Sequence, residues 1–175
     1  YLFCEGNHFR SYTFLGAHLI PNNTISGVRF ALWAPRAAKV SVIGDFNNWD
    51  ENASPMVLLE ESGIWWTFVP NLQQGALYKY ILTTYEGKKL IKVDPYGFYA
   101  ELRPKTASIV WNLQKFEWRD SLWQARKQKK IVYKEPMLIY EVHLGSWRQK
   151  AKGELYNYRE VTKQLVSYAK EMGFT

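Results

Sequence analysis

Residues 44–50 carry the side chains of this sequence that are best suited to recognise a ligand. They read GDFNNWD and place Asp45, Asn47, Asn48 and Trp49 close together. A saccharide presents apolar C–H faces ringed by hydroxyl groups, so its site needs a flat exposed aromatic ring together with amide, carboxylate or ammonium groups. The segment therefore predicts saccharide recognition, with Trp49 as the stacking surface.

Lys79 adds a candidate donor, because it occupies the polar side of a strand that otherwise reads Leu and Tyr, in LYKYIL. A second interpretation of the turn stays open. In it Trp49 folds back as a lid on the core, and Asn47 and Asn48 only stabilise the turn, as asparagine readily does. The residues alone favour neither interpretation.

No catalytic arrangement is predicted in residues 1–136. The carboxylates fall in turns or at strand ends, without the buried surroundings that mark an acid/base pair. The histidines are scattered, and no serine or cysteine lies in a nucleophile motif. The carboxylates are Asp45, Asp50, Glu60, Glu61 and Asp94, and the histidines are His8, His18 and, beyond this range, His143. Because neither a Cys/His cluster nor a glycine-rich phosphate loop occurs, no metal and no other cofactor is expected.

The net charge of +7 raises the possibility of an anionic partner such as nucleic acid. Most of that charge, however, falls outside the patterned strands, and two runs of basic residues lie in polar connecting stretches, 126–130 and 148–152. Such runs are typical of a solvated face, so no nucleic-acid partner is expected.

The single cysteine, Cys4, cannot form an internal disulfide bond, which indicates a reducing, cytoplasmic setting. No signal-peptide pattern opens the chain, and no apolar run approaches the roughly 20 residues that span a bilayer, so no membrane partner is expected. Since the first residue is Tyr1 rather than Met, we expect the sequence to begin inside a longer protein or after a removed segment.

Hydrophobic residues alternate with a period of two from Gly27 onward, which predicts strands. In GVRFALW, for example, Val28, Phe30 and Leu32 point to one face. Strands are expected over the segments GVRFALW, KVSVIG, IWWTFV, LYKYILTTY, KLIKV and ASIVW. About seven short strands separated by turns, with no helical pattern between them, predict an antiparallel β-sandwich between residues 26 and 112.

The pattern changes after Trp111. Residues 113–136 are charged and predict a linker with one helical turn. The apolar run from Met137 to Val142 predicts a strand buried on both faces. Val161, Leu165, Tyr168 and Met172 then form one stripe of an amphipathic helix that Gly173 ends. A strand followed by a helix predicts the start of a βαβ unit whose second strand is missing.

Several segments together resemble the N-terminal part of the bacterial 1,4-α-glucan (glycogen) branching enzyme family. They are GAH, VRFALWAPRAAKVSVIGDFNNWD, GALYKYIL, VDPYGFYAELRPKTASIVW and MLIYEVHLGSWR, in the order of the family. The resemblance implies a lead-in over 1–20, a family-48 carbohydrate-binding module with an immunoglobulin-like sandwich over 21–112, and a linker over 113–136. Residues 137–175 would then be the first strand and helix of a truncated family-13 (β/α)8 barrel.

The family transfers a cut α-1,4 glucan segment to a 6-hydroxyl group by a retaining mechanism. The resemblance places its catalytic carboxylates on later barrel strands, so none is expected in this chain, and the chain alone is expected to be inactive. Its expected partners are an α-glucan and the remainder of the barrel. Without that remainder, residues 137–175 are expected to be loosely held or to pair with another copy.

Glucan-binding members of the module family use a tryptophan and a lysine that match Trp49 and Lys79. A second stacking tryptophan before the DP motif has no counterpart, because Lys89, Leu90 and Ile91 stand there. Its absence predicts weak glucan binding, with a binding free energy that is less favourable by roughly 1 to 2 kcal/mol. The module is then expected to serve chiefly to pack against the barrel. Two alternatives remain: a free-standing glucan-binding or scaffolding protein, and a fragment of a related debranching or trehalose-forming enzyme.

Overall fold

The computed structural model describes residues 2–21 and 25–175 of the chain. The chain divides into two compact units, Tyr1–Glu117 and Trp118–Thr175. The ranges expected for the lead-in (1–20) and for the sandwich module (21–112) both include positions outside the described residues, namely 1 and 22–24.

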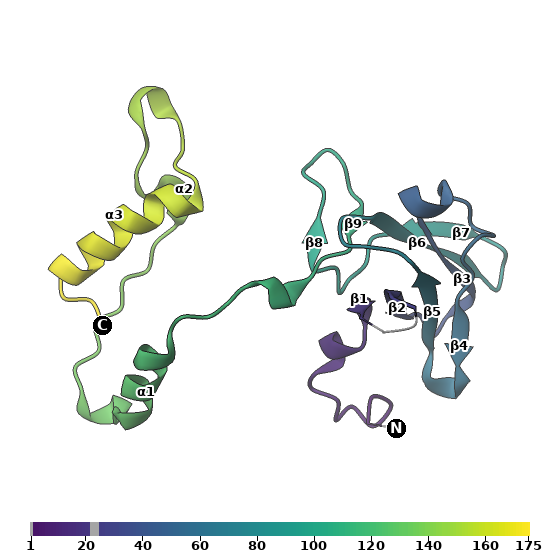
Figure 1. The fold of residues 1–175 in the computed structure, drawn as a ribbon, viewed down its shortest axis with the longest axis horizontal. Helices are drawn as coiled ribbons and strands as arrows, with labels where there is room; N and C mark the ends of the chain where they lie inside the picture. Colours follow the sequence, from purple (N-terminus) through teal and green to yellow (C-terminus); the bar gives the residue numbers. More distant parts are fainter. Residues whose placement is uncertain (1, 22–24) are drawn as a thin grey trace. The chain divides into compact units, whose positions relative to one another are not determined.

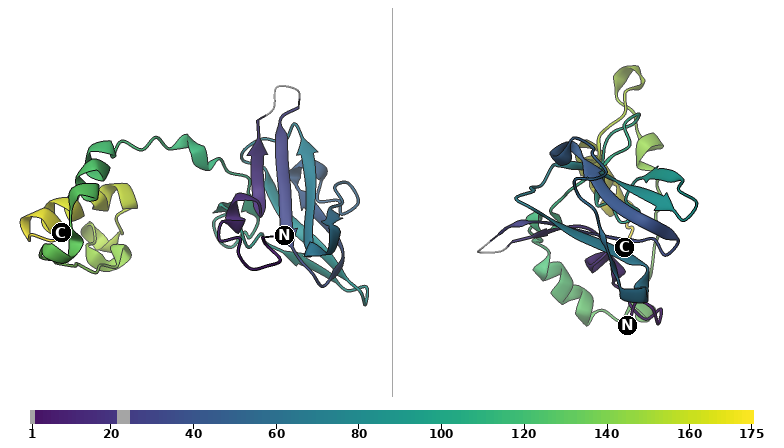
Figure 2. Two further views of the ribbon diagram at one scale, coloured as in Figure 1. Left: turned by 90° about the horizontal axis from the view of Figure 1, so that it is seen from below. Right: turned by 90° about the vertical axis from the view of Figure 1, so that its right-hand side faces the viewer.

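The first unit contains two antiparallel sheets. In one sheet the strands run in the order β1-β2-β5-β4, and Figure 2 shows them side by side. Their bounds are Gly16–Ile20 for β1, Gly27–Trp33 for β2, Ile64–Pro70 for β5 and Val57–Leu59 for β4. We call it the β2 sheet.

The other sheet, which we call the β6 sheet, runs in the order β3-β6-β9-β8, with β7 paired to β6 (Figure 1). Its strands are β3 (Ala37–Gly44), β6 (Leu77–Thr84), β7 (Lys89–Lys92), β8 (Tyr99–Ala100) and β9 (Ser108–Ile109).

The core lies between the two sheets. Alternate residues of β2 (Val28, Phe30 and Leu32) and of β3 (Val40 and Val42) are buried in one cluster. Tyr78 and Tyr80 of β6 and Trp65 of β5 complete its larger members. The predicted alternation and the predicted antiparallel, mainly β architecture are therefore confirmed.

Three strands were not named from the sequence. β1 lies in the expected lead-in segment, yet it pairs along its whole length with β2. β4 and β8 have only three and two residues, too few to show a period of two. As a result, eight strands, β2 to β9, lie where about seven were expected.

The N-terminal segment covers part of the outer face of the β2 sheet. Leu15 packs with Ala31 and Ile64 in a second buried cluster, against which Phe3 and Phe14 also pack. The short 3-10 helices of this unit are η1 (Ser11–Thr13), η2 (Asp45–Asn47), η3 (Glu60–Ser62) and η4 (Leu113–Lys115).

The second unit is helical. Its elements are α1 (Ser121–Lys129), η5 (Val132–Lys134), α2 (Leu144–Trp147), η6 (Ala151–Gly153) and α3 (Tyr158–Glu171). The single helical turn predicted for the linker is wrong, because α1 has nine residues. Leu, Gln, Ala, Arg and Lys dominate it, and their high helix propensity explains its length.

The predicted helix near the end of the chain is confirmed as α3. Asn157 and Glu160 form a reciprocal capping box at its start. Gly173, with φ of +76°, follows the helix in the left-handed conformation that ends helices. Val161 is buried, whereas Met172 of the predicted apolar stripe is 52% exposed.

The strand predicted over Met137 to Val142 is not formed. These residues belong to no helix or strand, and Met137 and Ile139 are exposed. A buried strand needs neighbouring strands to satisfy its backbone groups, and no described strand lies beside this segment. Its one ladder-like contact is with Thr175, whose backbone N–H donates to Leu138 O at 3.1 Å and whose Oγ1 accepts from Leu138 N at 3.0 Å.

Candidate functional site

The GDFNNWD turn leaves the end of β3 and is held by the Asn47 side chain. Asn47 Oδ1 accepts from Gly44 N at 2.9 Å, and its Nδ2 donates to Val42 O and to Ser54 Oγ, both at 3.1 Å. Asp45 fastens the same turn to β6, because its Oδ1 accepts from Leu77 N at 3.1 Å. Both groups are therefore engaged in holding the turn.

Trp49 does not pack into the core as a lid. Phe46 takes that place, since its ring stacks on Phe30 with the centroids 6.1 Å apart. The Trp49 side chain is 42% exposed. Asn48 and Trp49 both have positive φ, of 54° and 61°. This conformation is unusual for a bulky residue and marks stored strain of about 1 to 2 kcal/mol.

Lys79 lies on β6 beside the start of the turn. Its partner across the ladder is Ile43, and the next pair joins Gly44 to Tyr78. Because Tyr78 and Tyr80 are buried in the core, Lys79 faces outward from the β6 sheet. Its Nζ donates to Thr106 Oγ1 at 2.8 Å.

A buried carboxylate fixes the strand on either side of Lys79. Asp94 Oδ2 accepts hydrogen bonds from the hydroxyls of Tyr78 at 2.6 Å and Tyr80 at 3.2 Å. Asp94 Oδ1 accepts from Tyr96 N at 2.8 Å, and Ser108 Oγ accepts from Asp94 N at 3.1 Å. Strand β6 is thus anchored from inside the sandwich at both neighbours of the candidate donor.

Burial in the core shifts the pKa values of Asp94, Tyr78 and Tyr80. Burial raises the pKa of Asp94, although the hydrogen bonds from Tyr78, Tyr96 N and Tyr80 oppose the shift. Burial, followed by the repulsion of the Asp94 charge, also raises the pKa of both tyrosines, so their hydroxyls stay protonated as donors. The network serves to position β6, because all of its side chains lie in the interior.

Strand β7 extends the outward face on the far side of β6. Ile91 pairs with Ile81, which lies two residues after Lys79 and on the same face. Ile91 is 58% exposed. Ile91 belongs to the segment 89–91, where the resemblance led us to expect no second stacking tryptophan, and it gives this face an exposed aliphatic side chain.

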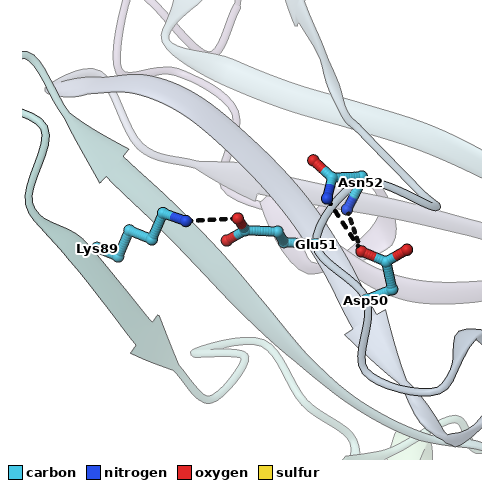
Figure 3. Close-up of polar contacts among 4 residues, drawn as sticks. All are labelled: Asp50, Glu51, Asn52 and Lys89. Atoms are coloured by element: carbon cyan, nitrogen blue, oxygen red, sulfur yellow. Dashed lines mark hydrogen bonds and ion pairs between the residues drawn. The ribbon is translucent and has the colours of Figure 1, made fainter.

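An ion pair joins the loop that follows the turn to β7. Lys89 Nζ contacts Glu51 Oε1, and the adjacent Asp50 carboxylate accepts two hydrogen bonds from Asn52, as Figure 3 shows. The pair is exposed, so it contributes little to stability. It holds the loop after Trp49 beside the outward face that carries Ile91.

The four residues predicted from the sequence therefore differ in their exposure and in their hydrogen bonds. Asn48 and Trp49 are both exposed, and Lys79 lies on the strand beside their turn. Asn47 is half-buried, and its amide group is used within the turn. Sequence reasoning missed Ile81 and Glu51. The alternation of β6 places Ile81 on the same face as Lys79. The register of β7 and the Glu51–Lys89 ion pair, however, depend on residues that are distant in sequence.

Neither a metal-binding cluster nor a membrane-spanning helix occurs among the described residues. No three His, Cys, Asp or Glu side chains among them lie close enough to form a metal site. None of the described helices is long and apolar enough to cross a bilayer. Cys4 is exposed and unpaired by any disulfide.

Comparison with known families defines the class of the first unit. Residues 14–97 match carbohydrate-binding module 48, the isoamylase N-terminal domain. The match runs from just before β1 to just after β7 and includes the turn and Lys79. The chain therefore carries a family-48 carbohydrate-binding module.

The whole chain is similar to 1,4-alpha-glucan branching enzymes named GlgB, matching their N-terminal region. It is 53% identical over 99% of its length to the enzyme of Halothermothrix orenii and 47% identical over 100% to that of Bacillus caldolyticus. It spans 28% and 26% of the length of these relatives. A crystal structure described as a putative alpha amylase from Salmonella typhimurium shares the fold, with a TM-score of 0.64, 22% identity, and coverage of 93% of this chain and 24% of that one.

Proposed function

We propose that the outward face of the β6 sheet binds α-glucan, with Trp49 stacking on a glucose ring and Lys79 donating to its hydroxyl groups. Asn48 contributes a rim amide, whereas Asn47 acts by holding the turn. The observation that carries this proposal is the strained, exposed Trp49 at the end of β3 beside Lys79. The family-48 match over the same residues supports it.

The affinity of this face is low by our proposal. One aromatic platform is present, and Ile91 offers only aliphatic contact at the second position. An aromatic contact contributes about 0.5 to 1.5 kcal/mol beyond its buried area, so its absence lowers affinity about two- to tenfold. The module then holds glucan by mass action near a catalytic domain and also packs against it.

The whole protein, we propose, is a cytoplasmic 1,4-α-glucan branching enzyme that transfers an α-1,4 segment to a 6-hydroxyl group. The identity to GlgB enzymes over 99% of the chain supports this assignment. Residues 137–175 would form the first strand and helix of the catalytic barrel, and 21–112 an immunoglobulin-like sandwich. The 175-residue chain alone is expected to show no transfer activity, because a barrel site draws on loops from several strands.

Affinity electrophoresis in gels containing glycogen tests the binding proposal. We expect glycogen to slow the wild-type chain and Trp49→Ala to reduce that retardation about two- to tenfold. Trp66→Ala is the matched control, because Trp66 is 38% exposed on β5, in the other sheet. Equal mobility of the wild type and Trp49→Ala would overturn the assignment of Trp49.

Extending the reading frame tests the proposal for the whole protein. If the coding sequence continues past Thr175, we expect the full product to lower the iodine absorbance of amylose by introducing branches. A stop codon directly after Thr175 would overturn the branching-enzyme proposal and leave a free-standing binding module.

A further inference from the structure

A groove separate from the Trp49 face lies beside β1, the edge strand of the β2 sheet. Its volume is about 690 Å3, within the range of small-molecule sites. One wall is β1 itself, and the facing walls are the loop after β5 and the segment after β9. We call it the Trp111 groove and define it by Tyr12, Phe98, Trp111, Gln73, Gln74 and Gln114.

The lining of the Trp111 groove is uncharged. No Asp, Glu, Lys or Arg occurs among the described residues that line it, although the chain as a whole carries a net charge of +7. A charged ligand would leave its charge without a partner there, which is costly. The groove therefore favours a neutral ligand.

Aromatic rings and amide groups both line the groove. Tyr12 and Trp111 are 51% and 36% exposed, and the Trp111 ring also packs against Tyr99 with the centroids 4.7 Å apart. Three glutamines supply amide groups that both donate and accept hydrogen bonds. Gln74 Oε1 has no donor among the described residues, so this side chain gains a partner by turning toward a ligand hydroxyl.

The walls of the groove are fixed by backbone hydrogen bonds. Gly75 N donates to Val110 O and Val110 N to Ala76 O, both at 2.9 Å, which ties the glutamine loop to the segment that carries Trp111. Asn112 caps η4 by accepting from Gln114 N at 2.8 Å. On the β1 side, the His18 ring packs edge-on against Phe98, with centroids 5.2 Å apart.

We propose that the Trp111 groove is a second oligosaccharide-binding site of this chain. Flat rings, neutral amide groups and an edge strand meet the needs of a ligand with apolar faces and many hydroxyls. The choice of an α-1,4 glucan as its ligand rests on the function proposed above. The two sites would engage separate segments of one glucan and raise its overall affinity.

Titration of the ¹⁵N-labelled 175-residue chain with maltoheptaose tests the proposal. We expect shifts of the Trp111 indole signal and of the Gln73, Gln74 and Gln114 side-chain amide signals, and we expect them to persist in Trp49→Ala. Tyr12→Ala and Gln114→Ala, two exposed positions on different walls, should each weaken the dissociation constant read from these signals about two- to tenfold. Trp66→Ala should leave it unchanged.

The outcomes separate this proposal from the assignment of Trp49. Shifts confined to Trp49 and the β6 sheet would overturn the groove site and support the Trp49 site. Shifts confined to the groove would support the groove site and overturn the Trp49 site. Groove shifts that are unaffected by both Tyr12→Ala and Gln114→Ala would overturn direct binding there, and no shift anywhere would overturn both sites.

Discussion

Phe46 and Trp49 lie three residues apart in one turn, but Phe46 packs against the core whereas Trp49 is exposed to solvent. Phe46 stacks on Phe30 inside the sandwich, whereas Trp49 is exposed at positive φ. The core is therefore closed without Trp49, so filling the core does not explain the strain at this position. Strain of this kind is commonly retained where it positions a functional side chain.

Replacing Trp49 with glycine should separate function from stability. Glycine adopts positive φ without steric cost, so the free energy of unfolding of Trp49→Gly is expected to exceed that of Trp49→Ala by about 1 kcal/mol. The same change removes the stacking ring and should weaken glycogen retardation about two- to tenfold. Urea denaturation and affinity electrophoresis measure the two effects. A loss of stability would show that the ring stabilises the fold.

An aromatic ring at position 91 should strengthen binding. Ile91 faces outward opposite Ile81, so Ile91→Trp is expected to add a second platform and to improve maltoheptaose affinity about two- to tenfold, measured by calorimetry. Leu90→Trp is the control. Leu90 pairs with the core-packed Leu82, so a larger side chain there should cost about 1 to 3 kcal/mol of stability. Unchanged affinity in Ile91→Trp would place the glucan elsewhere.

The pH dependence of stability should report the buried Asp94. Its pKa is raised in the folded state, so folding favours its protonated form. This contribution is complete below the ordinary carboxyl pKa and is lost as the pH rises through the folded value. Against Asp94→Asn, which cannot ionise, the wild type should lose up to about 1.4 kcal/mol per pH unit across that window. Parallel stability curves would contradict this expectation.

Hydrogen exchange should distinguish the two units. Val161 is buried in α3, while Tyr158 and Val166 of the same helix are 76% and 47% exposed. The amides of α3 should therefore exchange faster than those of β2 and β6, which pair within sheets. Equal protection of α3 and β6 in a monomer would contradict the prediction that residues 137–175 are loosely held.

The antiparallel sheets could be predicted from the sequence because each strand buries only one face. Apolar and polar residues therefore alternate along it without a break. Val28, Phe30 and Leu32 show this pattern, and Gly173 ends the predicted helix α3. The position of Lys79 on the outward face followed from the same rule. These features depend on near neighbours in sequence, which a single chain displays.

The features that could not be predicted depend on distant pairing. Strand β1 is defined by its ladder with β2, and Ile91 joins the face of Lys79 only through the register of β7. The strand expected over Met137 to Val142 failed for the same reason, because an apolar run becomes a strand only beside another strand. The Trp111 groove combines six stretches of the first unit that are separate in sequence.

The anchoring of Tyr78 and Tyr80 to Asp94 has a kinetic consequence for the residue between them. The backbone of β6 is fixed on both sides of Lys79, so a sugar bound there as we propose would meet a platform that is already formed, and only the Lys79 side chain would exchange Thr106 for a hydroxyl group. Encounter would then need no slow rearrangement. Weak affinity at such a face would appear as a short residence time.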